Sequence, residues 1–142
     1  MANYDLETER RAGYLLFRVT GPNSAETVKN YMQEVVAICN ESDCFRALIE
    51  EQLEGDRLDV QQIFSLTSEG AMDALGIFQA IAYVDPRMGE MAKFAETVAV
   101  NRGMPMKAFV SVVEAERWLL RQNAGTAEKQ LFEDQNSRDP FG

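Results

Sequence analysis

Acidic residues gather where one predicted strand gives way to the loop that follows it. Glu50 and Glu51 come directly after the apolar run of residues 45–49, and Glu54 and Asp56 follow within a few positions. Two neighbouring carboxylates could exchange a proton with a substrate or hold Mg²⁺. The stretch has no accompanying base, nucleophile or phosphate-binding loop to support either chemistry. We therefore favour a solvated acidic loop, and we expect no bound metal.

The rest of the chain offers little catalytic chemistry. Its 142 residues include no histidine, which removes Ser-His-Asp and Cys-His catalysis and the commonest general base near neutral pH. Two cysteines without histidine cannot build an ordinary zinc site. Neither the GxGxxG nor the GxxxxGKS/T pattern of nucleotide-binding loops occurs. We predict a protein that is not an enzyme and that needs no cofactor.

The charge balance narrows the choice of partners. With 14 basic and 23 acidic residues, the net charge is −9, which repels nucleic acid and anionic membrane surfaces. No apolar run approaches the roughly 20 residues of a membrane-spanning helix, so we expect no stable membrane insertion. The acidic start, MANYDLETE, is unlike a signal peptide. We expect a cytoplasmic protein with two unpaired thiols, Cys39 buried and Cys44 near a strand start.

Hydrophobic periodicity predicts a single α/β domain with the element order β-β-α-β-α-β-α-β-α. Strands are expected at residues 4–9, 14–20, 45–49, 78–84 and 106–110, and helices at 24–40, between Asp56 and Gly76, between Pro86 and Gly103, and from Ser111 to Leu120. The candidate helix caps are Asn23 with Glu26, Asp56 or Asp59, Asp85 before Pro86, and Ser111 with Glu114. Successive βα units require right-handed crossovers, which predicts one mixed, mostly parallel five-stranded sheet.

Three segments carry a resemblance to a known family. They are FRALIEEQLEG (45–55), FQAIAYVD (78–85) and AFVSVVEAERWLL (108–120). In this order and at these spacings, the chain resembles the SpoIIAA-like proteins, which are relatives of the STAS domains of anti-sigma-factor antagonists and of the STAS/SEC14-like group. The resemblance covers nearly everything from Tyr14 to Leu120. It implies a regulatory domain that binds another protein.

The family's phosphorylation switch does not carry over to this chain. In phospho-regulated STAS antagonists, a serine or threonine begins the helix after the middle strand, whereas here the corresponding stretch is Glu54, Gly55, Asp56 and Arg57. Asp56 could supply a fixed negative charge at this place, although helix capping explains an aspartate equally well. The resemblance implies that these four residues contact the protein partner.

Methionines suggest an alternative site. Five of the seven lie between Met72 and Met106, and methionine-rich surfaces adapt to apolar ligands. We therefore consider a hydrophobic, lipid-like ligand contacted by Met88, Met91, Phe94 and Met106, although a methionine stripe at helical spacing is more often core.

We predict a non-enzymatic regulatory or protein-interaction domain over residues 1–122, with binding of a small hydrophobic molecule as the alternative. Residues 123–142 are polar, and we interpret them as a tail that is mobile or docks on the domain or a second subunit. The sequence leaves open whether the chain is a monomer or a homodimer.

Overall fold

The computed structural model describes residues 3–56, 58–73, 77–87 and 89–122, without the side chains of residues 71–73, 89 and 91. Its strands are β1 (Asp5–Arg11), β2 (Tyr14–Pro22), β3 (Arg46–Glu54), β4 (Ala80–Val84) and β5 (Met106–Phe109), and its helices are α1 (Ala25–Ser42), α2 (Val60–Asp73), α3 (Gly89–Asn101) and a fourth helix at residues 112–122. The predicted tail, residues 123–142, lies outside the described residues.

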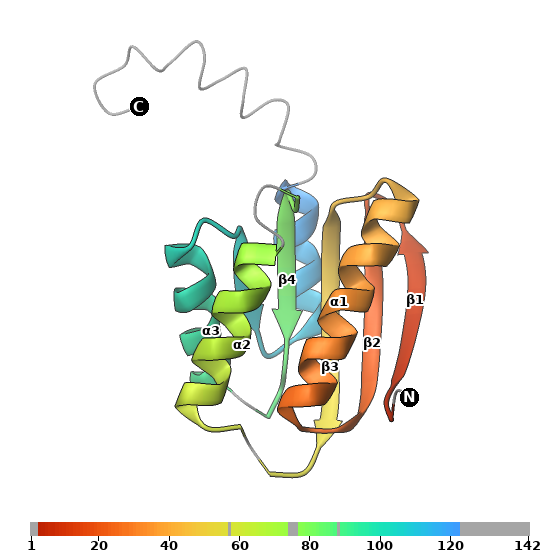
Figure 1. Cartoon of the computed structure of the whole chain (residues 1–142). Helices are drawn as coiled ribbons and strands as arrows, with labels where there is room; N and C mark the ends of the chain where they lie inside the picture. Colours follow the sequence, from red (N-terminus) through yellow and green to blue (C-terminus); the bar gives the residue numbers. More distant parts are fainter. Residues whose placement is uncertain (1–2, 57, 74–76, 88, 123–142) are drawn as a thin grey trace, which may run out of the picture.

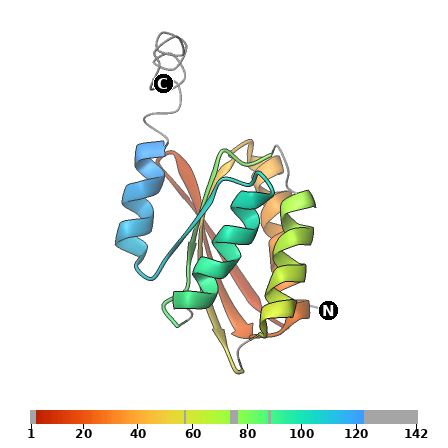
Figure 2. The same cartoon turned by 90° about the vertical axis from the view of Figure 1, so that its left-hand side faces the viewer.

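The five strands form one sheet in the order β1-β2-β3-β4-β5. β1 pairs antiparallel with β2, and every other neighbouring pair is parallel. Figures 1 and 2 show α1, α2 and α3 together on one face of the sheet, with helix 112–122 alone on the other. The predicted fold class and element order are confirmed.

Alternating side chains of β2 build a core on each face of the sheet. Leu15, Phe17 and Val19 belong to the cluster that also holds buried residues of α1, α2 and α3. Tyr14 and Leu16 belong to a smaller cluster that includes buried residues of helix 112–122. β2 is therefore buried on both faces, as its continuous apolar run predicts.

The structure corrects two of the predicted helix caps. Ser24, rather than Asn23, caps α1, and its side chain accepts a hydrogen bond from the backbone of Thr27. Asp85 is not the cap of α3, because α3 begins only at Gly89 and the Asp85 Oδ1 instead accepts from the amide of Arg87 at 3.0 Å. Proline after an aspartate starts a turn here, and the helix follows that turn.

Two other caps are confirmed. The carboxylate of Asp59 accepts from the Gln62 amide at 2.7 Å, and the Gln62 side chain accepts from the Asp59 amide at 3.0 Å, which is a reciprocal capping box before α2. Ser111 Oγ accepts from the Glu114 amide at 3.4 Å before helix 112–122. The predicted Asp56 alternative is therefore not needed for capping.

The largest correction concerns the acidic stretch after Ile49. β3 does not end there but continues to Glu54, because β2 extends to Pro22 and pairs with it over the whole length. Glu50 and Glu51 are strand residues whose side chains take opposite faces of the sheet. The solvated loop that we predicted from their charge is wrong for Glu51, which is 3% exposed.

Both cysteines are unpaired, with Cys39 buried in the core and Cys44 partly buried. Burial raises the pKa of the Cys39 thiol to about 12, so this thiol stays protonated and unreactive. Among the described residues, no helix has the length and apolar character needed to cross a membrane.

Candidate functional site

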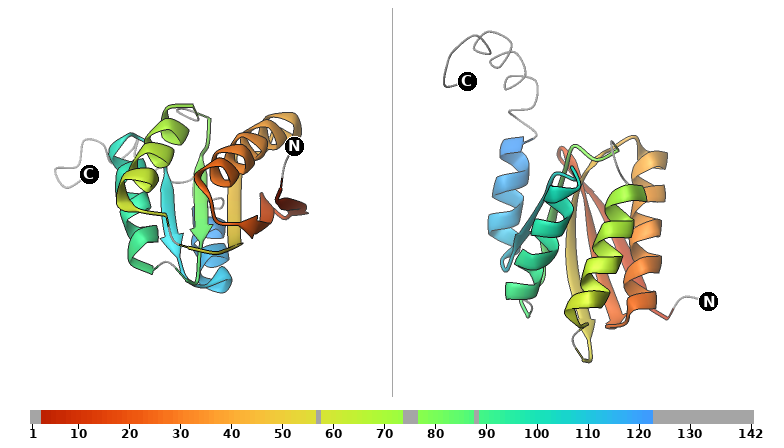
Figure 3. Two further views of the ribbon diagram at one scale, coloured as in Figure 1. Left: turned by 60° about the horizontal axis from the view of Figure 1, so that its bottom comes forward. Right: turned by 60° about the vertical axis from the view of Figure 1, so that its left-hand side comes forward.

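Three loops meet at the edge of the sheet where the parallel strands end. Figure 3 brings this edge forward in its left-hand view. The Asn23 amide, after β2, donates to the carbonyl of Glu54 at 2.7 Å, and the Asn23 side chain donates to the carbonyl of Asp56 at 3.0 Å. The Arg87 guanidinium, after β4, donates to the carbonyl of Gly55 at 3.5 Å. Hydrogen bonds therefore fasten the loop after β3 to both neighbouring loops.

The predicted partner-binding residues lie in this central loop. Glu54, Gly55 and Asp56 are exposed, whereas Arg57 lies outside the described residues. Gly55 has a φ of +117°, a conformation that glycine adopts without the strain that a side chain would bring. The loop is accessible to a partner, and its role in binding one stays a prediction.

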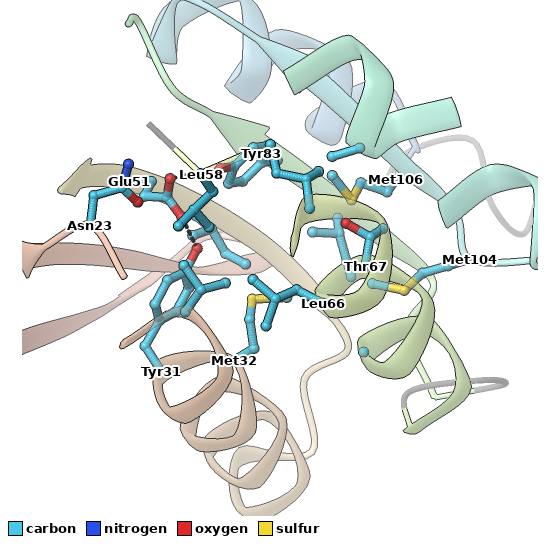
Figure 4. A pocket seen from close by; sticks show the side chains of 16 residues that line it. Asn23, Tyr31, Met32, Glu51, Leu58, Leu66, Thr67, Tyr83, Met104 and Met106 are labelled. Atoms are coloured by element: carbon cyan, nitrogen blue, oxygen red, sulfur yellow. Dashed lines mark hydrogen bonds between the residues drawn. The ribbon is translucent and has the colours of Figure 1, made fainter. Parts of the chain in front are cut away.

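A cavity of about 70 Å³ lies beneath this edge, between the sheet and the three helices on its larger face. Its apolar wall is formed by Val28, Met32, Ile49, Leu58, Ile63, Leu66, Ile81, Ala95, Met104 and Met106, with Gly70 on α2. Its polar lining residues are Asn23, Tyr31, Glu51, Thr67 and Tyr83. Figure 4 shows Asn23, Tyr31, Glu51 and Tyr83 at one end, and Leu66, Thr67, Met104 and Met106 at the other.

Glu51 is the only acidic residue among the described residues of this lining, and two tyrosine hydroxyls donate hydrogen bonds to it. Tyr31 of α1 donates to Glu51 Oε2, and Tyr83 of β4 donates to Oε1 at 2.7 Å. Tyr31 is 1% exposed and Tyr83 partly buried. A buried carboxyl group without partners would be very costly, and these two bonds offset part of that cost.

Burial raises the pKa of the Glu51 carboxyl from its ordinary 4.5 to about 7. The hydrogen bonds from Tyr31 and Tyr83 act in the opposite direction, since both stabilise the charged form. The nearby Asp85, itself 3% exposed, raises the pKa of Glu51 further, through repulsion between the two carboxylates and through a hydrogen bond between the two side chains. Glu51 therefore changes charge near neutral pH, inside an apolar cavity.

The predicted hydrophobic-ligand residues fall only partly at this cavity. Met106 lines it, together with Met104. Phe94 packs against the same core and is not part of the lining. Met88 and the side chain of Met91 lie outside what the structure describes. Of the two predicted residues whose side chains the structure describes, Met106 therefore lies at the cavity and Phe94 does not, and their role in binding a ligand stays a prediction.

Sequence reasoning missed Tyr31, Glu51 and Tyr83 as a site. Ile49, Glu51 and Leu53 alternate with polar residues, and this period of two was the available signal that β3 continues and turns Glu51 inward. Tyr31 occupies the same helical stripe as Val35, which predicts burial but not a contact with Glu51.

The polar groups at this site come from five of the described lining residues. They comprise carboxyl, phenol, hydroxyl and amide groups. Within the described ranges, no three histidine, cysteine or acidic side chains converge in a way that could hold a metal ion. No protein-family model and no curated protein matches the sequence.

Proposed function

We propose that this chain is a non-enzymatic binding protein that takes a small, mostly apolar molecule into the cavity beneath the carboxyl edge of its sheet. The observation that carries this proposal is the combination of an apolar wall with one buried, titratable carboxyl group. Binding sites for small molecules commonly combine a hydrophobic lining with a few polar groups that fix the orientation of the ligand.

The size of the cavity limits the ligand. Its volume of about 70 Å³ is roughly half that of an engineered cavity of about 150 Å³ that binds benzene. A ligand with a short aliphatic body fits this space, whereas a long acyl chain would require the covering helices to move apart. We therefore narrow the lipid-like ligand of the sequence prediction to a small molecule.

Gly70 provides a direct test, because it lines the cavity and a Cβ placed there meets no heavy atom within 4 Å. Gly70→Ala is expected to raise the free energy of unfolding by about 0.5–1 kcal/mol, since alanine is the better helix former. Gly70→Leu is expected to fill the cavity. Ligand binding should weaken at least about tenfold, because the ligand would lose its apolar contacts with the cavity wall. Chemical denaturation measures the first effect.

Binding is measured by NMR with n-butylamine, 1-butanol and butyrate, which share an apolar body and differ in head group. The wild-type protein should show shifts at amides around the cavity with at least one probe, and Gly70→Leu should suppress them. Ser65→Leu is the matched control, because Ser65 is an exposed residue of the same helix outside this cavity. If all three probes leave the wild-type spectrum unchanged, the cavity is not a binding site of this kind.

The exposed loop above the cavity supports a second function, regulatory binding of a protein in the cytoplasm. We propose membership of the SpoIIAA-like group on the residues given above, and that resemblance implies a partner at Glu54, Gly55, Asp56 and Arg57. The structure adds a physical link, because Asn23 both lines the cavity and bonds to the Asp56 carbonyl. A ligand that contacts Asn23 would therefore also act on the loop.

Reversing the charge at Asp56 tests this second function. We expect Asp56→Lys to reduce capture of a protein partner from host lysate at least about fivefold, because the exposed side chain would carry the wrong sign at the interface. Glu41→Lys is the matched control. Glu41 is an exposed residue near the carboxyl end of α1, whereas the loop with Asp56 contacts Asn23, just before the amino end of that helix. Equal capture by the wild type and Asp56→Lys would place the interface elsewhere.

A further inference from the structure

We propose that the cavity selects a small aliphatic amine, whose ammonium group binds Glu51 and whose apolar body lies toward Met104 and Met106. This inference rests on the proposed function and names the chemical class of its ligand. It follows from three properties of the lining: which hydrogen-bonding groups remain free, which charge they carry, and where the apolar wall lies.

The hydrogen bonds at Glu51 leave acceptors for a ligand. Tyr31 and Tyr83 both donate their hydroxyl protons to the carboxylate, so each phenol oxygen presents only lone pairs to the cavity. A carboxylate has about four lone-pair positions. The two tyrosines occupy two of them and a hydrogen bond with Asp85 engages a third, which leaves one for a ligand. Asn23 donates one of its two amide N–H groups to the Asp56 carbonyl, which leaves its own carbonyl oxygen as a further acceptor and one N–H as a donor. A group rich in N–H donors complements this end of the cavity.

The charge of the lining also favours an ammonium group. Among the residues that the structure describes, the titratable groups that face Glu51 are Tyr31 from α1, Tyr83 from β4 and Asp85 at the end of β4, and none of these three is a base. The described lining residues of α2 and α3 carry no charge: apart from Gly70 and Thr67, they have apolar side chains. A carboxylate ligand would meet like charge and find few donors, whereas an ammonium group brings three donors and the opposite charge.

The two ends of the cavity match the two ends of such a molecule. Figure 4 shows Glu51 and its tyrosine partners at one end, and Met104 and Met106 at the other. Methionine side chains adapt their shape to an aliphatic chain, so the methionine end sets little restriction on branching. An amine bound in this way places its charge against Glu51 and its hydrocarbon against the apolar wall.

Binding of an amine should also depend on pH. Burial keeps the pKa of free Glu51 near 7, so the carboxyl group is largely protonated in acid and charged in mild alkali. An amine stays protonated across this interval, because alkylammonium groups resemble the lysine side chain with its pKa near 10.4. The affinity should therefore rise through pH 7, and binding should release a proton from Glu51 below that pH.

The experiment titrates ¹⁵N-labelled protein at pH 8 with n-butylamine, 1-butanol and butyrate. We expect n-butylamine to shift amides of β3 and α2 around the cavity with a Kd in the millimolar range, and the other two probes to bind at least about tenfold more weakly. Glu51→Gln should weaken amine binding at least about tenfold and leave 1-butanol binding unchanged. Glu41→Gln is the matched control, because it removes the same charge from an exposed position near the carboxyl end of α1, outside the cavity.

The outcomes separate the two proposals. Equal affinity for 1-butanol and n-butylamine, tighter binding of butyrate, or amine binding that survives Glu51→Gln would overturn the amine inference and leave the cavity as a ligand site. Loss of amine binding with Glu41→Gln as well would mean that general surface charge attracts the amine, which also overturns the amine inference. Absence of cavity shifts with every probe would overturn both proposals.

Discussion

At pH 8, Glu51→Gln is expected to be more stable than the wild-type protein by about 3 kcal/mol, and this advantage is expected to vanish below pH 4.5. The native structure raises the pKa of Glu51 from 4.5 to about 7, so the folded protein binds more protons than the unfolded chain between these values. Stability therefore falls as the pH rises through that interval. Each pKa unit corresponds to 1.36 kcal/mol, which gives the size of the loss.

Glutamine removes this penalty because it carries no charge at any pH. Its amide is similar in shape to the carboxyl group. The amide oxygen can accept a hydrogen bond from one of the two tyrosines, Tyr31 or Tyr83, and the amide NH2 group can donate to the phenol oxygen of the other. Urea denaturation from pH 4.5 to pH 8.5 measures the difference in unfolding free energy between the variant and the wild type, in which the contributions of other groups cancel. Glu54→Gln, at the exposed end of β3, should show a nearly constant difference.

A constant difference for Glu51→Gln as well would contradict the raised pKa. A difference that grows toward acid would also contradict it, because that sign belongs to a carboxylate whose native contacts favour the charged form. The expected result would instead establish that the protein keeps a carboxyl group at a cost to its own stability. Such a cost is typical of residues that serve a binding site.

Much of the fold could be predicted from local patterns. The apolar run of β2 predicted a strand covered on both faces, and Asp59 and Ser111 marked helix starts that the structure confirms. The succession of βα units then predicted a mostly parallel sheet, and the structure confirms parallel pairing from β2 to β5. These features depend on short stretches of chain and on general rules of chirality.

The site depends on contacts between distant residues, which is why it escaped prediction. Glu51 lies 20 positions from Tyr31 and 32 from Tyr83, and no local pattern specifies those hydrogen bonds. The charge of Glu51 also hid its alternation with Ile49 and Leu53, so that β3 was predicted to end at Ile49. Glutamate is normally exposed, so a buried glutamate contradicts what its residue type predicts. Functional sites are where such conflicts between residue type and environment are expected.

Tyr31→Ala is expected to lower the free energy of unfolding by about 3–5 kcal/mol, the cost usual for deleting a large aromatic side chain from a core. Tyr31 is among the largest fully buried side chains and packs in the main core cluster beside the cavity. Tyr31→Phe keeps the ring and removes only the hydroxyl, which leaves Glu51 Oε2 without its tyrosine donor. This second variant should lose about 1–3 kcal/mol.

Comparing the two variants separates the contribution of the ring from that of the hydroxyl. The pH dependence of the loss tests the contribution of the hydroxyl further. The hydroxyl of Tyr31 stabilises the charged form of Glu51, so its removal should raise the pKa of Glu51 further and cost more at pH 8 than at pH 5. Tyr4→Phe is the matched control, because the Tyr4 hydroxyl also donates to a glutamate, Glu34 at 2.6 Å, but in an exposed position. It should change stability by about 0.5 kcal/mol or less. Equal losses for Tyr31→Phe at both pH values would mean that the hydroxyl does not serve the Glu51 charge, and that Tyr31 contributes to this fold through its ring alone.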